Sequence, residues 1–244
     1  MGECYQILVT GEHEELSRET FIYNGKKIEW TQVPVLRFER LPLEENTIQN
    51  IVKSKIEWLV FTSPRAVRFW SEILLEQGTD FPIETQIACI GKNTADYANY
   101  DGFTPDFFPK EPGTESFLEA FKDLLSNGIK KPKVLIPMAI DGRTQIAETL
   151  REIGCSVTIL PIYKTLPSED IPKVLSQDQI RSASLFLFTS PSSVDAVIKH
   201  FNIQSLLKTG AIGSYTADYM EKKGFGKVPV LPEGNFQRVG ELLC

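Results

Sequence analysis

The chain carries an internal repeat, and this repeat limits its fold more than any other feature of the sequence. Residues 61–64 and 188–191 both read Phe-Thr-Ser-Pro, each time after an apolar run and before a helical pattern. The same offset of 127 (188 − 61) aligns ILVT at 7–10 with VLIP at 134–137. Because self-similarity at a fixed spacing indicates repeated architecture, we expect the chain to build the same strand-to-helix corner twice.

A second pair of blocks extends the repeat. IGKNTADY at 90–97 matches IGSYTADY at 212–219 with an offset of 122 (212 − 90), so a five-residue deletion (127 − 122) separates this pair from the first. Several matched blocks in one order indicate a duplicated unit, with copies at about 1–128 and 129–244.

Each copy alternates short apolar runs with segments of helical periodicity. The predicted strands are QILVT, EWTQVPVL, WLVFT and QIACI in the first copy and KVLIP, SVTILPIY, LFLFT and GAIGS in the second. The first strand of each copy, QILVT or KVLIP, is suited to burial on both faces. The pieces between these strands are expected to be helical, as at 146–153, where apolar residues share one helix face. This alternation is typical of parallel sheets covered by helices, so the predicted fold class is α/β with two domains.

The composition argues against several classes of protein. The net charge is −6, so the chain lacks the basic surface with which proteins bind nucleic acid. No apolar run is long enough to cross a membrane and the N-terminus has no signal-peptide pattern, so we expect a cytoplasmic protein. Separately, we expect a monomer. The sequence has neither a nucleotide-binding glycine loop nor a nucleophile elbow.

The cysteines and histidines stand apart from one another, which argues against a zinc or other metal site. They are Cys4, Cys89, Cys155, Cys244, His13 and His200. We expect the cysteines to be reduced and mostly packed, and the histidines to lie on the surface.

The two Phe-Thr-Ser-Pro corners are predicted to bind an anion. Ser63 and Ser190 are suited to cap a helix, and a proline follows each as the first helical residue. Ligands of parallel α/β sheets lie beyond the carboxyl ends of the strands, and helix N-termini favour negative charge. One such corner alone is most simply an ordinary helix cap. Two corners facing one cleft would suit a small ligand with many carboxylates.

The IGKNTA and IGSYTA blocks are expected to add further donors. In each block a glycine, Gly91 or Gly213, would let the backbone turn tightly. A threonine hydroxyl, from Thr94 or Thr216, would then lie beside a helix start. In the second block Ser214 adds another hydroxyl.

Four more side chains are candidates for the same cleft. Arg65, Lys92 and Arg143 each follow a strand and would add positive charge, although a solvated surface role fits them equally well. Tyr163 differs because the first copy has Leu36 at the equivalent position (163 − 127). Tyr163 is therefore either an interface aromatic or a single proton donor facing the ligand.

Six blocks together resemble the uroporphyrinogen-III synthase family. They are VFTSPRAVRFW, CIGKNTADYANYDGF, VLIPMAIDGRTQIAETLREIG, PIYKT, LFTSPSSVDAVI and AIGSYTADYMEKKGF, in the family's order and over nearly the whole chain. The resemblance implies two flavodoxin-like α/β domains that differ from the sequence copies. One domain would join 1–35 with 168–244 and the other would span 38–163. A two-stranded β-ladder linker at about 34–38 and 161–167 would connect them.

The resemblance also implies a reaction. Hydroxymethylbilane, a linear tetrapyrrole, would be cyclised with inversion of ring D and loss of water to give uroporphyrinogen III. No cofactor is implied, and hydroxymethylbilane synthase would be a possible transient partner that hands over the substrate. Tyr163 would be the acid near the leaving hydroxyl. The residues that would hold the substrate's carboxylates are Ser63, Arg65, Lys92, Thr94, Arg143, Ser190, Ser214 and Thr216.

One position departs from the family pattern. Many bacterial members place arginine after the first strand, where this chain has Thr10-Gly11. The missing charge motivates an alternative function, a non-catalytic two-domain binder of a small polyanion or a regulatory relative with the same fold.

Overall fold

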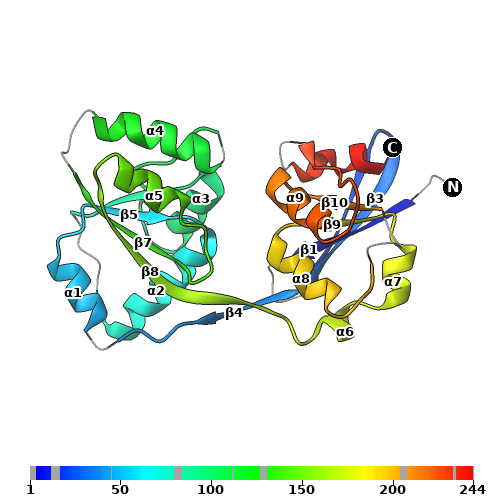
Figure 1. The fold of residues 1–244 in the computed structure, drawn as a ribbon, viewed down its shortest axis with the longest axis horizontal. Coiled ribbons are helices and arrows are strands. Elements are labelled where there is room, and N and C mark those ends of the chain that lie inside the picture. Colours follow the sequence, from blue (N-terminus) through cyan, green and yellow to red (C-terminus); the bar gives the residue numbers. More distant parts are fainter. Residues whose placement is uncertain are drawn as a thin grey trace. The chain divides into compact units, whose positions relative to one another are not determined.

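The chain divides into two compact units, each built on one sheet (Figure 1). Unit 1 combines Met1–Phe38 with Thr165–Cys244, and unit 2 is Glu39–Lys164. Residues 4–11, 17–44, 46–79, 84–111, 113–126, 131–203, 208–232 and 235–243 are described by this computed structural model. In both five-stranded sheets parallel pairs predominate, and helices flank them, which confirms the α/β class.

The sheet of unit 2 has the strand order β4-β8-β7-β5-β6. Its strands are β4 Leu36–Arg40, β5 Trp58–Phe61, β6 Gln86–Cys89, β7 Lys133–Ala139 and β8 Ser156–Pro167. The helices of this unit are α1 Thr47–Lys53, α2 Pro64–Gln77, α3 Lys92–Tyr100, α4 Thr114–Ser126 and α5 Gln145–Glu152. All four residues of β5 are buried, as expected for a parallel strand with both faces covered.

Helix α2 begins and ends as its sequence predicts. The Oγ of Ser63 accepts a hydrogen bond from the Ala66 backbone N–H at 3.1 Å, and Pro64 occupies the first turn. The helix ends at Gly78, whose positive φ of 58° favours glycine. Because Trp70 is fully buried on its inner face, α2 is held firmly against the sheet.

The sheet of unit 1 has the strand order β10-β9-β1-β3-β2. Its strands are β1 Cys4–Gly11, β2 Ser17–Tyr23, β3 Lys26–Pro34, β9 Leu185–Phe188 and β10 Thr209–Ala211. The helices are α6 Ile171–Val174, α7 Gln177–Ser182, α8 Pro191–Ile198, α9 Ser214–Lys222 and the 3-10 helix η2 Phe236–Leu243. Ser190 caps α8 through its Oγ, so the second Phe-Thr-Ser-Pro corner is also a helix start.

The prediction of a helix between the first two strands of unit 1 was wrong. The described part of this connection is strand β2, which pairs antiparallel with β3. Asn24 and Gly25 form the turn between them, with φ of 48° and 74°. An Asn-Gly pair between strands is a strong signal for a tight hairpin, because both positions need positive φ.

The 3-10 helix η2 packs against the hairpin that replaces the expected helix. The ring of Phe236 lies 4.8 Å from that of Trp30 on β3, and Val239 is fully buried. The hydroxyl of Tyr23 on β2 donates to a carboxylate oxygen of Glu241 at 3.3 Å. Trp30, Phe236 and Val239 belong to one hydrophobic core with Ile28. The last described residues of the chain are therefore part of the packing of its first strands.

The chain crosses between the units along β4 and β8, which run antiparallel as neighbours in the sheet. The Leu41 N–H donates to the Ile162 carbonyl, and the Ser168 N–H donates to the Val35 carbonyl, both at 2.9 Å. Lys164 and Glu39, beside the crossing, form an ion pair at 2.7 Å.

The described cysteines are free and mostly packed, as expected. Cys89 and Cys155 are buried and free, and burial raises the pKa of Cys89 to about 12, so this thiol stays protonated. Cys4 is exposed at the first residue of strand β1. Cys244 and His13 lie outside the described residues.

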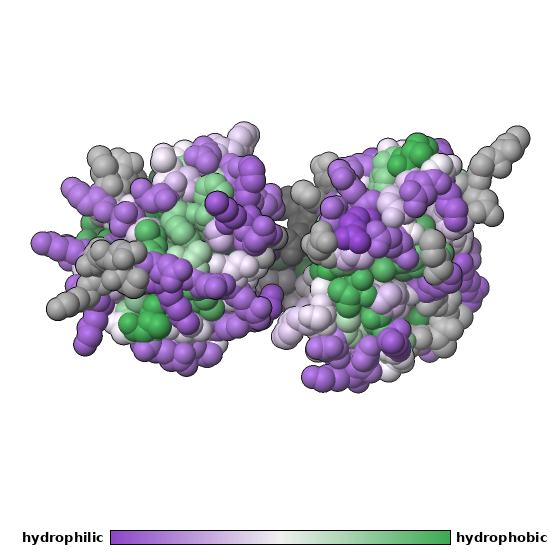
Figure 2. All heavy atoms as spheres, turned by 90° about the horizontal axis from the view of Figure 1, so that it is seen from above, coloured by the Kyte–Doolittle hydropathy of each residue, from purple (hydrophilic) through white to green (hydrophobic). Residues whose placement is uncertain are grey.

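The surface is mixed in character. Figure 2 shows hydrophilic residues over most of the visible face, with smaller hydrophobic areas between them. Within the described residues, no helix has the length and apolar character needed to cross a membrane. The same part of the chain has no group of three or more His, Cys, Asp or Glu that could hold a metal ion.

Candidate active site

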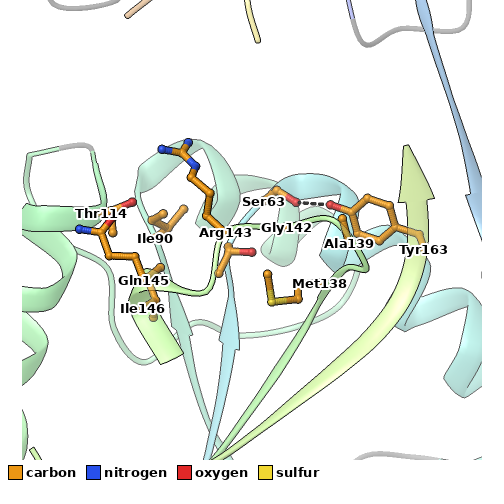
Figure 3. Close-up of a pocket in the computed structure, with 11 residues that line it drawn as sticks. Ser63, Ile90, Thr114, Met138, Ala139, Gly142, Arg143, Gln145, Ile146 and Tyr163 are labelled. Carbon is orange, nitrogen blue, oxygen red and sulfur yellow. Dashed lines mark hydrogen bonds between the residues drawn. The ribbon is translucent and has the colours of Figure 1, made fainter. Parts of the chain in front are cut away.

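A pocket of about 160 Å³ lies at the carboxyl ends of the strands in unit 2 (Figure 3). This is the edge at which α/β sheets bind ligands. The lining residues come from the ends of β5 and β7, from the middle of β8 and from the segments that follow β6 and β7. They are Thr62, Ser63, Ile90, Thr114, Met138, Ala139, Gly142, Arg143, Gln145, Ile146 and Tyr163.

Tyr163 and Ser63 meet in this pocket. The phenolic oxygen of Tyr163 lies 3.4 Å from the Oγ of Ser63, and either can donate (Figure 3). This distance is long for a bond between two hydroxyls, which usually lie about 2.7–2.8 Å apart. Tyr163 is only 5% exposed, and its ring stacks on Phe69 with centroids 5.1 Å apart and planes 22° from parallel.

The hydrogen bonds of Ser63 limit which way the protons can point. A serine hydroxyl has one proton and two lone pairs, and Ser63 already accepts from the Ala66 N–H. When Ser63 donates its proton to Tyr163, the phenolic oxygen accepts and the phenolic proton does not point at Ser63. The pair can thus present a proton donor to the pocket without leaving the serine unsatisfied.

Arg143 adds positive charge at the same pocket. It lies on the loop between β7 and α5, is exposed, and extends away from Met138 (Figure 3). Gly142 lets this loop lie close to Met138 on β7, because a Cβ there would meet the end of the Met138 side chain. Gln145 and Thr114 also line the pocket but were not predicted from the sequence: Gln145 begins the helix that follows β7, and Thr114 begins α4, far along the chain from β6.

The other predicted residues of unit 2 do not line this pocket. Arg65 is the second residue of α2, and Thr94 is buried in the first turn of α3 with 3% of its surface exposed. Lys92 begins α3, and its ammonium pairs with the Asp96 carboxylate at 2.6 Å. The structure therefore brings Ser63, Arg143 and Tyr163 together, and leaves the roles of the other three as predictions.

The remaining candidates belong to unit 1. Ser214 is exposed at the first position of α9, and Thr216 is buried in its first turn. The chain bends at Gly91 and Gly213 as expected, but both residues have extended φ angles, 179° and −152°, which any residue type can adopt.

Ser190 sits in a buried network of hydroxyls. Ser190 and Ser193 bond reciprocally, each Oγ accepting the other's backbone N–H at 3.2 Å. The Oγ1 of Thr10 accepts from the Thr189 N–H at 2.9 Å and donates to the Oγ of Ser193 at 3.0 Å. Thr10 and Ser193 are both fully buried, so this network joins β1 to the start of α8.

The corner in unit 2 lacks this network. Its residues equivalent to Thr10 and Ser193 are Pro137 (10 + 127) and Ala66 (193 − 127), and neither has a hydroxyl. The two corners share their cap but differ in what surrounds it. Ser190 bonds to the hydroxyl network of unit 1, and Ser63 bonds to Tyr163 of unit 2.

We expect Thr10→Val to destabilise the protein by about 1–3 kcal/mol, because valine keeps the shape but leaves the Thr189 N–H without its acceptor. Urea unfolding would measure the change. Thr20→Val is the matched control, since Thr20 is exposed on β2. Equal effects of the two substitutions would contradict a stabilising role of the network.

Comparison with known proteins decides the family. The family model described as uroporphyrinogen-III synthase HemD matches residues 24–235. The chain belongs to the uroporphyrinogen-III synthase family. This confirms the resemblance seen in the sequence blocks. A protein of Methanocaldococcus jannaschii, itself only provisionally named a uroporphyrinogen-III synthase, is 27% identical over 205 residues, which are 80% of this chain and 81% of that protein.

Solved structures of the family have the same fold. Uroporphyrinogen-III synthetase of Helicobacter pylori matches with a TM-score of 0.64 at 18% identity, covering 98% of this chain and 97% of that one. A mutant uroporphyrinogen III synthase of the extremely thermophilic bacterium Thermus thermophilus matches with a TM-score of 0.57 at 17% identity, covering 98% and 96%. At such identities the likeness supports the two-sheet α/β fold alone.

Proposed function

We propose that the chain is an active uroporphyrinogen-III synthase of the cytoplasm, which cyclises hydroxymethylbilane with inversion of ring D and loss of water. The observation that carries this proposal is the pairing of Tyr163 with Ser63 at the strand-end pocket, in a chain that belongs to this family. The duplicated fold has this tyrosine once, since the equivalent residue is Leu36.

The first chemical step needs a proton donor for the leaving hydroxyl. In the proposed step, Tyr163 gives its phenolic proton to this hydroxyl as the carbon–oxygen bond breaks and water leaves. The electron pair of the pyrrole nitrogen stabilises the positive carbon left by water, while the Ser63 hydroxyl keeps its proton and donates a hydrogen bond to the phenolate. This carbon bonds to the ring-D carbon that already carries the bridge from ring C, which gives a spiro intermediate. The old bond to the bridge then breaks and the bridge bonds to the other α-carbon of ring D, whose released proton restores the phenol. The enzyme contributes mainly positioning and electrostatic stabilisation.

The pocket is suited to part of the substrate. Its volume of about 160 Å³ is below the roughly 300–1,000 Å³ of typical small-molecule sites, so we propose that it receives only the reacting end. Arg143 and the start of α2 would hold a carboxylate there. Lys92 would join by exchanging its exposed pair with Asp96, which costs little because such pairs contribute only about 0–1 kcal/mol.

Unit 1 would hold further carboxylates at its helix starts, through Ser190, Ser214 and Thr216. The reaction eliminates water and forms a carbon–carbon bond without net oxidation, so it calls for no redox cofactor.

An isomer assay tests the proposal. Purified protein is mixed with hydroxymethylbilane, the products are oxidised to porphyrins, and the two isomers are separated by chromatography. We expect the type III isomer to predominate. Type I alone, which is the product of spontaneous closure, would overturn the proposal.

The same assay distinguishes the synthase from the alternative function, a non-catalytic binder. Tight binding of uroporphyrinogen without any type III product would favour a non-catalytic binder. The position that motivates this alternative, Gly11, has no side chain that could bind a carboxylate, and a Cβ there would require the Gln32 side chain on β3 to move. We therefore propose that carboxylate binding in this chain does not use that position.

A further inference from the structure

Phe69 contacts the ring of Tyr163 and was not among the residues that the sequence analysis selected. It lies in α2, is 3% exposed, and stacks on Tyr163 with centroids 5.1 Å apart and planes 22° from parallel. The hydroxyl of Tyr163 meets Ser63, the cap of the same helix. Helix α2 and its cap therefore contact both ends of this side chain.

The stacking contact is the stronger constraint on the orientation of the ring. At 3.4 Å the bond between the hydroxyls of Tyr163 and Ser63 is too long to fix the phenol by itself. A buried ring face in contact with a second ring restricts rotation about both side-chain torsions, because turning would bring the rings into collision. The position of the phenolic oxygen at the pocket therefore depends on Phe69.

The equivalent corner of unit 1 can be compared with the corner of unit 2 that holds Tyr163 and Phe69. In unit 1 the equivalents of Tyr163 and Phe69 are Leu36 (163 − 127) and Ala196 (69 + 127). Both are buried in one hydrophobic core, at 4% and 0% exposure. The strand-to-helix corner is thus built in unit 1 without either ring. The aromatic pair is a special feature of unit 2, where the pocket lies.

We propose that Phe69 is a positioning residue for the reaction: its ring holds Tyr163 so that the hydroxyl faces the pocket beside Ser63. This proposal rests on the function proposed above. It assigns a role to a residue that does not itself line the pocket.

The test replaces the ring and keeps an apolar side chain, in Phe69→Leu. We expect kcat for type III formation to fall by about 10- to 100-fold with KM within about twofold, since a displacement of 1 Å can cost about 100-fold in rate. Phe121→Leu is the matched control. Phe121 is also buried in unit 2 and stacks on Phe117 at 5.1 Å and 21°, but it does not line the pocket. Its kcat should stay within about twofold of the unchanged protein.

A double substitution shows whether Phe69 acts through the phenol. In the Tyr163→Phe background, Phe69→Leu should change kcat by less than about twofold, because the group that it positions is already absent. Effects that multiply would overturn the proposal, as would a Phe69→Leu protein with unchanged kcat, or equal losses in the Phe69 and Phe121 variants. Phe69→Met, which retains apolar volume without a ring, gives the same comparisons if the leucine variant does not fold.

A spectroscopic measurement separates failure of this proposal from failure of the proposed function. In protein with carbon-13-labelled tyrosine and no substrate, loss of the neighbouring ring should shift the Tyr163 resonances and speed its ring flips. The Phe121 variant should leave them unchanged. Unshifted Tyr163 resonances in Phe69→Leu would overturn the positioning role, even where the isomer assay succeeds. Shifted Tyr163 resonances together with a failed isomer assay would overturn the proposed function but not the positioning of Tyr163 by Phe69.

Discussion

Tyr163→Phe is expected to lower kcat for type III formation by about 100-fold or more and to leave KM nearly unchanged. The substitution removes one oxygen and keeps the ring that stacks on Phe69, so any loss comes from the hydroxyl. Proton transfer by a positioned side chain typically contributes about 10²- to 10⁴-fold. The measurement is the steady-state rate with hydroxymethylbilane, with the two isomers quantified separately.

Two further variants test whether the loss of rate is specific to the Tyr163 hydroxyl. Tyr97→Phe removes a phenol from α3, away from the pocket, and should leave the rate unchanged. Ser63→Ala should cost less than Tyr163→Phe, because it removes the group that supports the phenolate and leaves the proton donor in place. Full activity of Tyr163→Phe would exclude the phenol as the acid.

Val239→Asp is expected to unfold unit 1 at a temperature at which unit 2 remains folded. Val239 is fully buried in η2, against the face of the first strands, and an uncompensated buried charge costs about 3–5 kcal/mol. Whole domains are stabilised by only about 5–15 kcal/mol, so this loss is a large fraction of the total. We propose that the two units are independent domains, and two separate transitions in calorimetry would support this.

Trp30 offers a local probe of the same event. It belongs to unit 1 and contacts Phe236, so its fluorescence should change in the first transition. Val230→Asp is the control, since Val230 is 39% exposed on the segment before η2. A single transition for the whole chain in Val239→Asp would argue against independent domains.

The repeat in the sequence predicted much of the architecture. The two Phe-Thr-Ser-Pro blocks fold as two capped helix starts at the ends of β5 and β9, because serine caps and a first-turn proline act locally. Local signals of this kind do not depend on the rest of the fold. The same strand-end reasoning selected Ser63, which follows β5, whereas Tyr163 lies within β8 and reaches the pocket because the neighbouring strand β7 ends beside it.

The pairing of the strands could not be worked out from the repeat. Each sheet takes strands from both sequence copies: β1 pairs with β9, and β5 pairs with β7. Equivalent strands in the two copies have similar apolar patterns, so periodicity alone does not distinguish between their possible partners. Only the family resemblance pointed to discontinuous units.

Two other differences between the predicted and the observed structure have a chemical origin. The hairpin at β2 was missed because apolar periodicity was read ahead of the Asn24-Gly25 turn signal. The environment of Ser190 was missed because its network joins Thr10 to Ser193, residues distant in sequence whose hydroxyls meet only in the folded unit. Polar contacts of this kind depend on tertiary structure and cannot be predicted from the residue types alone.

The packing of η2 on the first strands has a consequence for biosynthesis. Unit 2 is a continuous segment, Glu39–Lys164, and all of it has been synthesised before any of β9, β10 or η2. The strands β1 to β3 are made first, yet the partners that cover Ile7 and Ile28 are made last. On the ribosome, unit 2 can therefore fold while the earliest part of the chain still exposes an apolar sheet face, which makes this the interval in which the nascent protein most needs protection from aggregation.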